Sequence, residues 1–250
     1  TGNIGQQFTE SSNDLGRALK DRMHVIVDVD HFFPNAGDTL EILAGNTDPR
    51  VEFSEGASGS GEEIIKKYCE IKGRQARISK LIVANYFIQG LDGCDDGKSK
   101  RKMGNAWPNA VSSHGRGSTD ALVLPLSVRA AKSVLRLSDC LDDLALERGV
   151  SSDVVDQGAL SSMLQAYRLV ATHSGVLNEA DVINNFGNDY YRTMDAVVTA
   201  ISGDFKRNED ALAAGLGMVK AGKREDKVLN LFNGKWGFMK ETLERMLRRS

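Results

Sequence analysis

The sequence predicts a mainly α-helical fold, with a helical bundle-like body and a small β-containing N-terminal segment. Only four prolines occur in 250 residues, and long stretches without proline favour helices. Most of the second half repeats its apolar residues with the spacing of amphipathic helices. A β-branched, alternating run, typical of a strand, occurs near the start at residues 24–30.

Residues 1–60 are predicted to form the strand-containing N-terminal segment. After a short polar helix at residues 10–22, the run at 24–30 is the clearest strand. Residues 39–43 and 50–53 are further candidate strands, separated by residues with turn chemistry. A run of glycine and serine then predicts a flexible connection to the next region.

Residues 61–125 are predicted to form a basic helical segment followed by a long polar loop. The pattern becomes helical from Glu62, and a second helical segment begins near Arg74. Residues 90–120 are rich in Gly, Lys, Ser and Asp. A loop of that length is usually functional or disordered.

Residues 126–250 are predicted to form a helical domain. Serine and asparagine before the apolar stripes, and glycine after them, are helix caps. Apolar spacing predicts helices over residues 128–144, 155–170, 178–184, 190–201, 212–219 and 226–246. Gly234 and Gly237 are expected to divide the last of these.

The three cysteines, Cys69, Cys94 and Cys140, are odd in number and widely spaced. They predict a reducing compartment, and therefore a cytoplasmic protein or a component of a virion. No apolar run is long enough to cross a bilayer, so we expect no membrane partner. The first residues also lack the pattern of a secretory signal.

Charge is sorted into blocks along the chain, although the formal net charge is only −2. Residues 1–59 carry a balance of −6, residues 60–136 of +7, residues 137–219 of −8 and residues 220–250 of +5. The simpler interpretation is that these are solvated helix faces. The alternative is that acidic and basic faces meet between copies, or that basic blocks form a groove for a polyanion.

Two aspartates at the end of the predicted strand form the most enzyme-like feature. Asp28 and Asp30 would point to one face of a strand, where paired carboxylates can bind Mg²⁺. The pair resembles the first motif of haloacid-dehalogenase-type phosphatases, which implies phosphoryl transfer. That motif has a small residue and Thr or Val after the second aspartate, whereas His31, Phe32 and Phe33 stand here.

A second acidic motif is Asp142-Asp143, followed by Glu147. It resembles the metal-binding motif of terpene synthases, but the later Asn188-Asp189 is too close in sequence to be its partner. We therefore expect Asp142 and Asp143 on a solvated helix face. The sequence contains no nucleophile elbow, P-loop or zinc-ligand spacing, so we predict a binding protein without cofactors rather than an enzyme.

The basic residues of the 61–125 region are the best remaining candidates for a binding site. Lysine and arginine neutralise phosphates without base-specific geometry, and an aromatic ring can stack on bases. The predicted nucleic-acid-binding residues are Lys66, Lys67, Lys72, Arg74, Arg77, Lys80, Lys98, Lys100, Arg101, Lys102, Trp107 and Arg116. The competing interpretation is a solvated helix and loop.

These features favour a self-assembling, nucleic-acid-binding structural protein, such as a viral nucleocapsid or coat protein. It would form a homo-oligomer and bind the RNA backbone through a basic groove without sequence specificity. Two alternatives stay open. One is an Mg²⁺-dependent phosphoryl-transfer enzyme that uses Asp28 and Asp30, and the other is a helical adaptor that binds protein alone.

Overall fold

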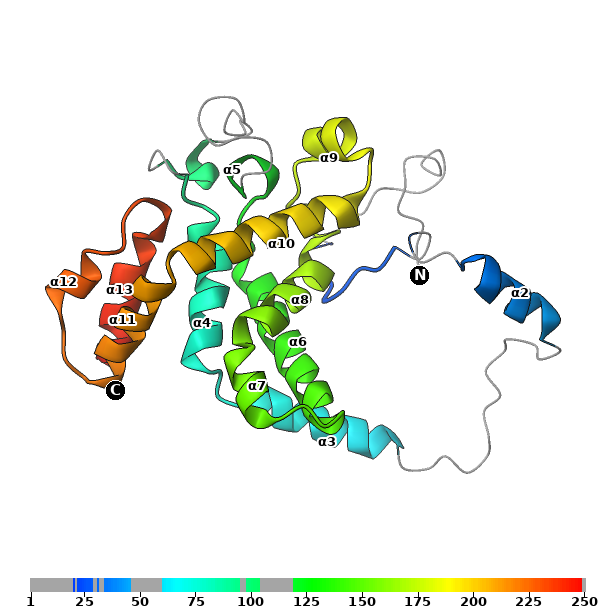
Figure 1. Cartoon of the computed structure of the whole chain (residues 1–250), viewed down its shortest axis with the longest axis horizontal. Helices are drawn as coiled ribbons and strands as arrows, with labels where there is room; N and C mark the ends of the chain where they lie inside the picture. Colours follow the sequence, from blue (N-terminus) through cyan, green and yellow to red (C-terminus); the bar gives the residue numbers. More distant parts are fainter. Residues whose placement is uncertain are drawn as a thin grey trace. The chain divides into compact units, whose positions relative to one another are not determined.

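The computed structural model describes residues 20, 22–28, 31, 34–45, 60–94, 98–103 and 119–248 (Figure 1). The described residues are mainly helical, which confirms the predicted class. The chain divides into two compact units. Unit 1 comprises Thr1–Asp14 and Val27–Arg74, and unit 2 comprises Leu15–Ile26 and Gln75–Ser250. The predicted boundary after residue 125 therefore falls inside unit 2.

Two helices lie in the described part of unit 1, α2 (Ala36–Ala44) and α3 (Ser60–Gly73). A capping box starts α2. The Asn35 side chain accepts hydrogen bonds from the backbone N–H groups of Gly37 and Asp38, and the Asp38 carboxylate accepts one from the Asn35 N–H. These contacts satisfy backbone donors that a helix start leaves open.

The predicted β-content is wrong for the residues that the structure describes. Residues 24–28 form no strand, and residues 39–43 lie inside α2. The residues at 50–53 are outside the described part of the chain. A strand needs a pairing partner, because β-propensity depends largely on packing against neighbouring strands. The capping box at Asn35 acts within one turn, so it favours a helix start here without any neighbouring strand.

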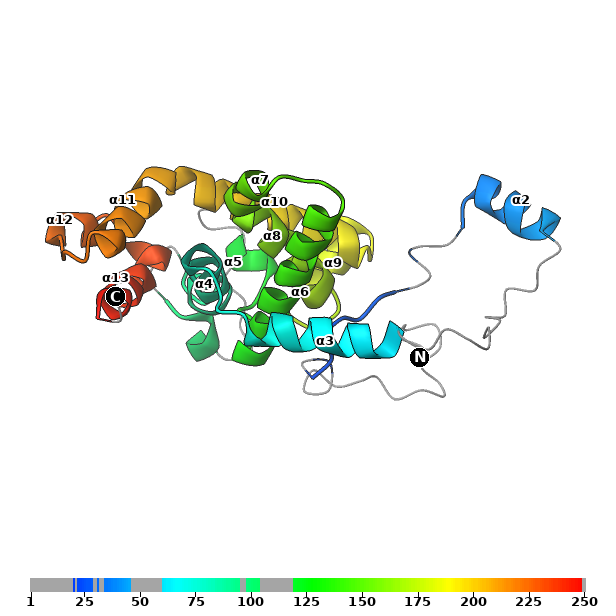
Figure 2. The ribbon, with the colours of Figure 1, turned by 90° about the horizontal axis from the view of Figure 1, so that it is seen from below.

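The centre of unit 2 is built by helices that pack side by side in both views (Figures 1 and 2). Helix α6 packs along α8, and α4 contacts both. Their bounds are α4 (Ile78–Asn85), its π-helical continuation η3 (Tyr86–Gly90), α6 (Val128–Glu147) and α8 (Ala159–Ala171). The rings of Phe87 and Tyr167 stack at 4.3 Å between centroids, and both side chains are fully buried.

Local signals explain where α6 and α8 begin and end. The Ser127 hydroxyl caps α6 by accepting from the Ala130 N–H, and Gly149 follows the helix with a φ of 86°. A left-handed residue is a common helix stop, and glycine adopts it without steric cost. The helix predicted over 155–170 is divided at Gly158 into α7 (Ser152–Gln157) and α8.

The second half of unit 2 follows the predicted order of helices. Helix α10 packs on α8 and α9, whereas α11 contacts both α12 and α13 (Figure 1). The bounds are α9 (Glu179–Phe186), α10 (Tyr190–Arg207), α11 (Glu209–Lys220), α12 (Asp226–Leu229), the 3₁₀-helix η5 (Gly234–Trp236) and α13 (Phe238–Leu247). None of the described helices has the length and apolar character needed to cross a bilayer.

A buried carboxylate, Asp204 of α10, connects three elements of unit 2. Its Oδ2 accepts a hydrogen bond from the Tyr86 hydroxyl at 2.6 Å, and the carboxylate also pairs with Lys235 and Arg207. The Tyr86 ring contacts Phe205 and Trp236, each with a centroid separation of 4.9 Å. Charge and aromatic packing together therefore hold the π-helix against α10 and η5.

Gly90 closes the π-helix directly beside the Tyr86 ring. A Cβ atom on Gly90 would lie 2.5 Å from the Tyr86 Cδ2 atom, and Asp204 limits how far that ring can move. We expect Gly90→Ala to lower the free energy of unfolding by about 1–3 kcal/mol, as overpacking does. Gly217→Ala is the control, because nothing lies within 4 Å of its added Cβ.

In the α11 interior, Gly217→Ala should stabilise the protein by up to about 1 kcal/mol. Urea unfolding followed by circular dichroism measures both effects. Equal stability of the two variants would show that the Tyr86 ring moves aside at little cost, and would contradict the close packing described for η3.

Candidate nucleic-acid interface

The first four predicted basic residues belong to unit 1. Lys66, Lys67 and Lys72 lie on α3, Arg74 follows it, and all four are exposed. The Lys72 Nζ atom lies 5.9 Å from the Tyr68 ring centroid. The same helix carries three glutamates, Glu62, Glu63 and Glu70. The three lysines and three glutamates of α3 balance in number, so the helix has no net side-chain charge.

Arg77 and Lys80 belong to unit 2, where they pair with carboxylates. The Lys80 side chain is fully buried, and its Nζ lies 2.5 Å from Asp139 and 2.7 Å from Asp142. Arg77 pairs with the same Asp142 and with Asp156 of α7. These contacts give Lys80 an internal role that joins α4 to α6, and they leave it inaccessible to a polyanion.

The expected solvated position of Asp142 and Asp143 is wrong. Both residues are buried, with relative exposures of 7% and 8%. Helix α6 packs on α4, and Lys80 and Arg77, on and beside α4, supply the positive charge that the buried Asp142 carboxylate needs. A lysine inside a largely apolar segment was the available signal for this pairing, since lysine is almost never fully buried unless paired.

Lys100 begins the 3₁₀-helix η4 (Lys100–Met103) and is also buried. Its Nζ donates to the backbone carbonyls of Thr119 and Val123, each at 3.1 Å. Thr119 starts the short helix α5 (Thr119–Leu122). The ammonium group therefore binds the carbonyl of the first residue of α5 and the carbonyl of the residue that follows its last one. Because the carbonyls of a helix point toward its C-terminal end, a cation is favoured there.

The neighbours of Lys100 remain at the surface. Lys98, Arg101 and Lys102 are exposed. Arg101 still donates from its guanidinium to the carbonyl of Ile88 at 3.0 Å, and its backbone N–H donates to Asp92. The segment is thus attached to the core through Lys100 and Arg101. Trp107 and Arg116 lie outside the described residues.

Ion pairs between distant blocks of sequence account for part of the charge pattern. Lys80 of the basic block at 60–136 pairs with Asp139 and Asp142 of the acidic block that follows. Lys235 of the last basic block pairs with Asp204 of the same acidic block. The blocks therefore partly neutralise one another inside unit 2, and the charge left at the surface is smaller than the block totals.

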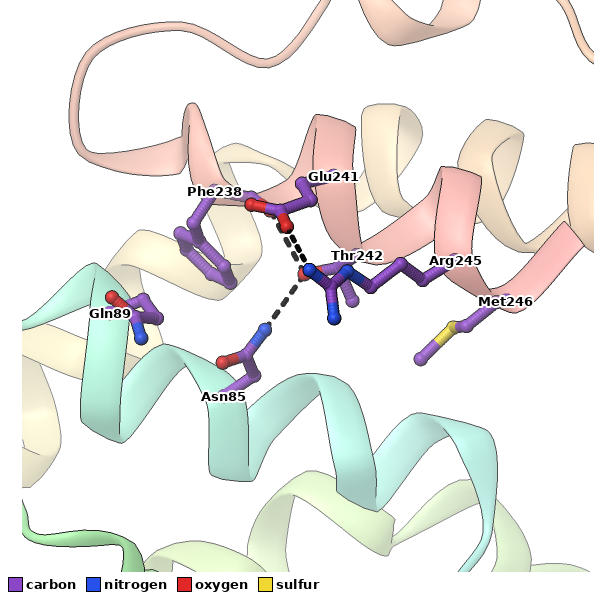
Figure 3. A pocket seen from close by; sticks show the side chains of 7 residues that line it. All are labelled: Asn85, Gln89, Phe238, Glu241, Thr242, Arg245 and Met246. Atoms are coloured by element: carbon purple, nitrogen blue, oxygen red, sulfur yellow. Dashed lines mark hydrogen bonds and ion pairs between the residues drawn. The ribbon is translucent and has the colours of Figure 1, made fainter. Parts of the chain in front are cut away.

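A cavity of about 450 Å³ lies between α4, η3 and α13 (Figure 3). Its lining is mostly polar, with one aromatic ring and one methionine. The residues are Asn85, Gln89, Phe238, Glu241, Thr242, Arg245 and Met246. The sequence offered no signal for this site, because its two walls are more than a hundred residues apart along the chain.

Asp28 is within the described residues, and Asp30 is outside them. In the part of the chain that the structure describes, no group of three or more His, Cys, Asp or Glu side chains could hold a metal ion. Comparison of the chain with family models, curated proteins and solved structures gives no match. The function is therefore inferred from the chain's own residues.

The internal role of Lys80 can be tested by unfolding. Lys80→Met would leave Asp139 and Asp142 buried without their shared cation. We expect it to lower the free energy of unfolding by about 3–5 kcal/mol, the usual effect of breaking a buried ion pair. Lys132→Met is the matched control, because Lys132 is exposed on α6, and surface changes usually stay within about 0.5 kcal/mol. Equal stability of the two variants would contradict the role assigned to Lys80.

Proposed function

We propose that this chain is a self-assembling structural protein that binds the RNA backbone without sequence specificity. The proposal is supported chiefly by the uncovered apolar residues of unit 1. Exposed basic residues on and just before η4 support the nucleic-acid part. A viral nucleocapsid or coat protein is the kind of protein that combines these two properties.

Helix α2 carries the assembly part of the proposal. None of its side chains is buried, and Leu40, Ile42 and Leu43 are 68%, 63% and 77% exposed. A helix of nine residues is too short to be stable alone in water, and most helices gain stability by packing an apolar face. Helix α3 likewise exposes Ile64 and Ile65. Such helices suit a groove on another protein.

A second copy of this chain is the partner that the charges favour. Exposed carboxylates such as Asp153 on α7 and Glu179 on α9 belong to the acidic block. Exposed lysines at Lys220, Lys223 and Lys227 belong to the last basic block. Opposite charges on different elements of one chain suit head-to-tail contacts between copies, which can continue into long assemblies.

The RNA part of the proposal rests on the residues around η4. Lys98, Arg101 and Lys102 are exposed on a segment that is attached to the core by Lys100. Contacts to phosphate need positive charge within reach and no particular base. The exposed lysines of α3, in unit 1, are a separate basic group with less effect, because glutamates on the same helix oppose their charge.

Assembly is tested by changing α2. We expect Leu40→Glu with Leu43→Glu to convert particles or oligomers into monomers, because charges replace the apolar side chains that a partner would cover. Light scattering coupled to size-exclusion chromatography measures the mass. Glu41→Ala, on the same helix, should leave assembly intact. A wild-type chain that is monomeric at all protein and salt concentrations would contradict the proposal.

RNA binding is tested by removing two exposed lysines, with Lys98→Gln and Lys102→Gln combined. For a single strand, each lost phosphate contact lowers the slope of log K against log salt by about 0.7. We therefore expect the slope to fall by about 1.4 if both lysines contact phosphate. Fluorescence anisotropy with a labelled oligonucleotide of mixed sequence measures it.

Lys132→Gln with Lys206→Gln makes the same change of charge elsewhere on unit 2 and should leave the slope unchanged. Absorbance at 260 and 280 nm before and after nuclease reports RNA that co-purifies. A chain that carries no RNA, and binds none at low salt, would leave the adaptor as the better account.

A further inference from the structure

The cavity between α4, η3 and α13 presents hydrogen-bonding groups that are held in place. The Asn85 side-chain amide donates to the Thr242 hydroxyl at 2.7 Å, and that hydroxyl donates to the Phe238 carbonyl at 2.9 Å (Figure 3). This chain of bonds fixes the orientation of the Asn85 amide. Within the described residues, its Oδ1 atom has no donor, so the acceptor is available to a ligand.

Gln89 adds a second amide to the same wall. It lies four residues after Asn85, so both side chains project from one side of the helix. Its side chain is exposed and makes no hydrogen bond within the described part of the chain. The two amides together offer donors and acceptors side by side, and such a combination matches the edge of a nucleobase.

Phe238 supplies an aromatic surface on the opposite wall. Its ring is half-buried, lines the cavity, and lies nearly parallel to Trp236, with an interplanar angle of 22° and 6.0 Å between centroids. Such packing restrains the ring. A restrained ring is a platform for stacking, which tolerates any base because every base has a π-face.

Arg245 lines the cavity from α13. Its side chain is 73% exposed and pairs with Glu241 one turn earlier on α13. An exposed ion pair of this kind contributes little free energy. The guanidinium can therefore leave Glu241 and bind a phosphate instead. A nucleotide matches this arrangement, because its base is planar and polar and its phosphate carries a negative charge.

We infer that this cavity binds a nucleobase of the single-stranded RNA. Phe238 stacks on the base, Asn85 and Gln89 bond to its edge, and Arg245 contacts the adjoining phosphate. The inference rests on the proposed function, since it names a second contact with the same RNA. The cavity of about 450 Å³ has room for a base of either size, in agreement with binding that ignores sequence.

The test uses nucleoside 5′-monophosphates as probes of the whole chain in solution. We expect uridine and adenosine monophosphates to shift the NMR signals of the Asn85 and Gln89 side-chain amides, which the variants Asn85→Ala and Gln89→Leu identify. Ribose 5-phosphate, which lacks the base, should leave these signals in place. Equal shifts from ribose 5-phosphate would overturn the inference in favour of simple anion binding.

Two variants then measure the contribution to RNA affinity. We expect Phe238→Leu, which keeps an apolar side chain without the ring, to weaken oligonucleotide binding about tenfold. Gln89→Leu should weaken it about fivefold. Gln165→Leu, at an exposed position of α8, should have no effect. Thermal unfolding of each variant shows that the fold is intact.

The two proposals fail separately. Salt-dependent RNA binding that is unchanged in Phe238→Leu and Gln89→Leu overturns the base-binding cavity and leaves backbone binding in place. Amide shifts with nucleotides in a chain that binds no RNA support a base-binding cavity and overturn the proposed function.

Discussion

The segment from Ile78 to Gly90 is held near each end by a buried charge. Lys80 is neutralised by Asp139 and Asp142 of α6, and Tyr86 donates to Asp204 of α10. An uncompensated charge in a dry interior is very costly, so these pairs leave little freedom for α4 to slide or rotate. The position of the cavity depends on this, because Asn85 and Gln89 project from the same segment.

The same pairs change the meaning of the alternating charge blocks. Counted along the sequence, residues 137–219 are strongly acidic, with a total balance of −8. Several of those carboxylates are buried, among them Asp139, Asp142 and Asp204, and cations from the basic blocks compensate them. The alternation therefore has an internal cause in part. Only the exposed charged side chains are available to a partner, and the charge totals of the blocks do not separate them from the buried ones.

Unit 1 follows a different physical rule from unit 2. In unit 2, apolar residues such as Phe87 and Tyr167 are fully buried, and ion pairs join different helices, as between Lys80 and Asp139. Helix α2 has a well-formed start at Asn35 and no buried side chain. Its local signals specify a helix, while its apolar side chains need a surface to cover them. This contrast is the physical basis for proposing that copies of the chain associate.

The sequence by itself determined the helical class and most helix positions in unit 2, because apolar spacing and caps such as Ser127 and Asn178 act within a turn or two. The strand predicted at residues 39–43 was wrong, because the capping box of Asn35 starts a helix that includes these residues. Only the tertiary structure decided which charges are buried. Lys80 and Asp139 are 59 residues apart, and the two ends of the Asn85–Thr242 bond are 157 apart. Periodicity and caps carry no information over such separations, since the packing of helices brings these residues together.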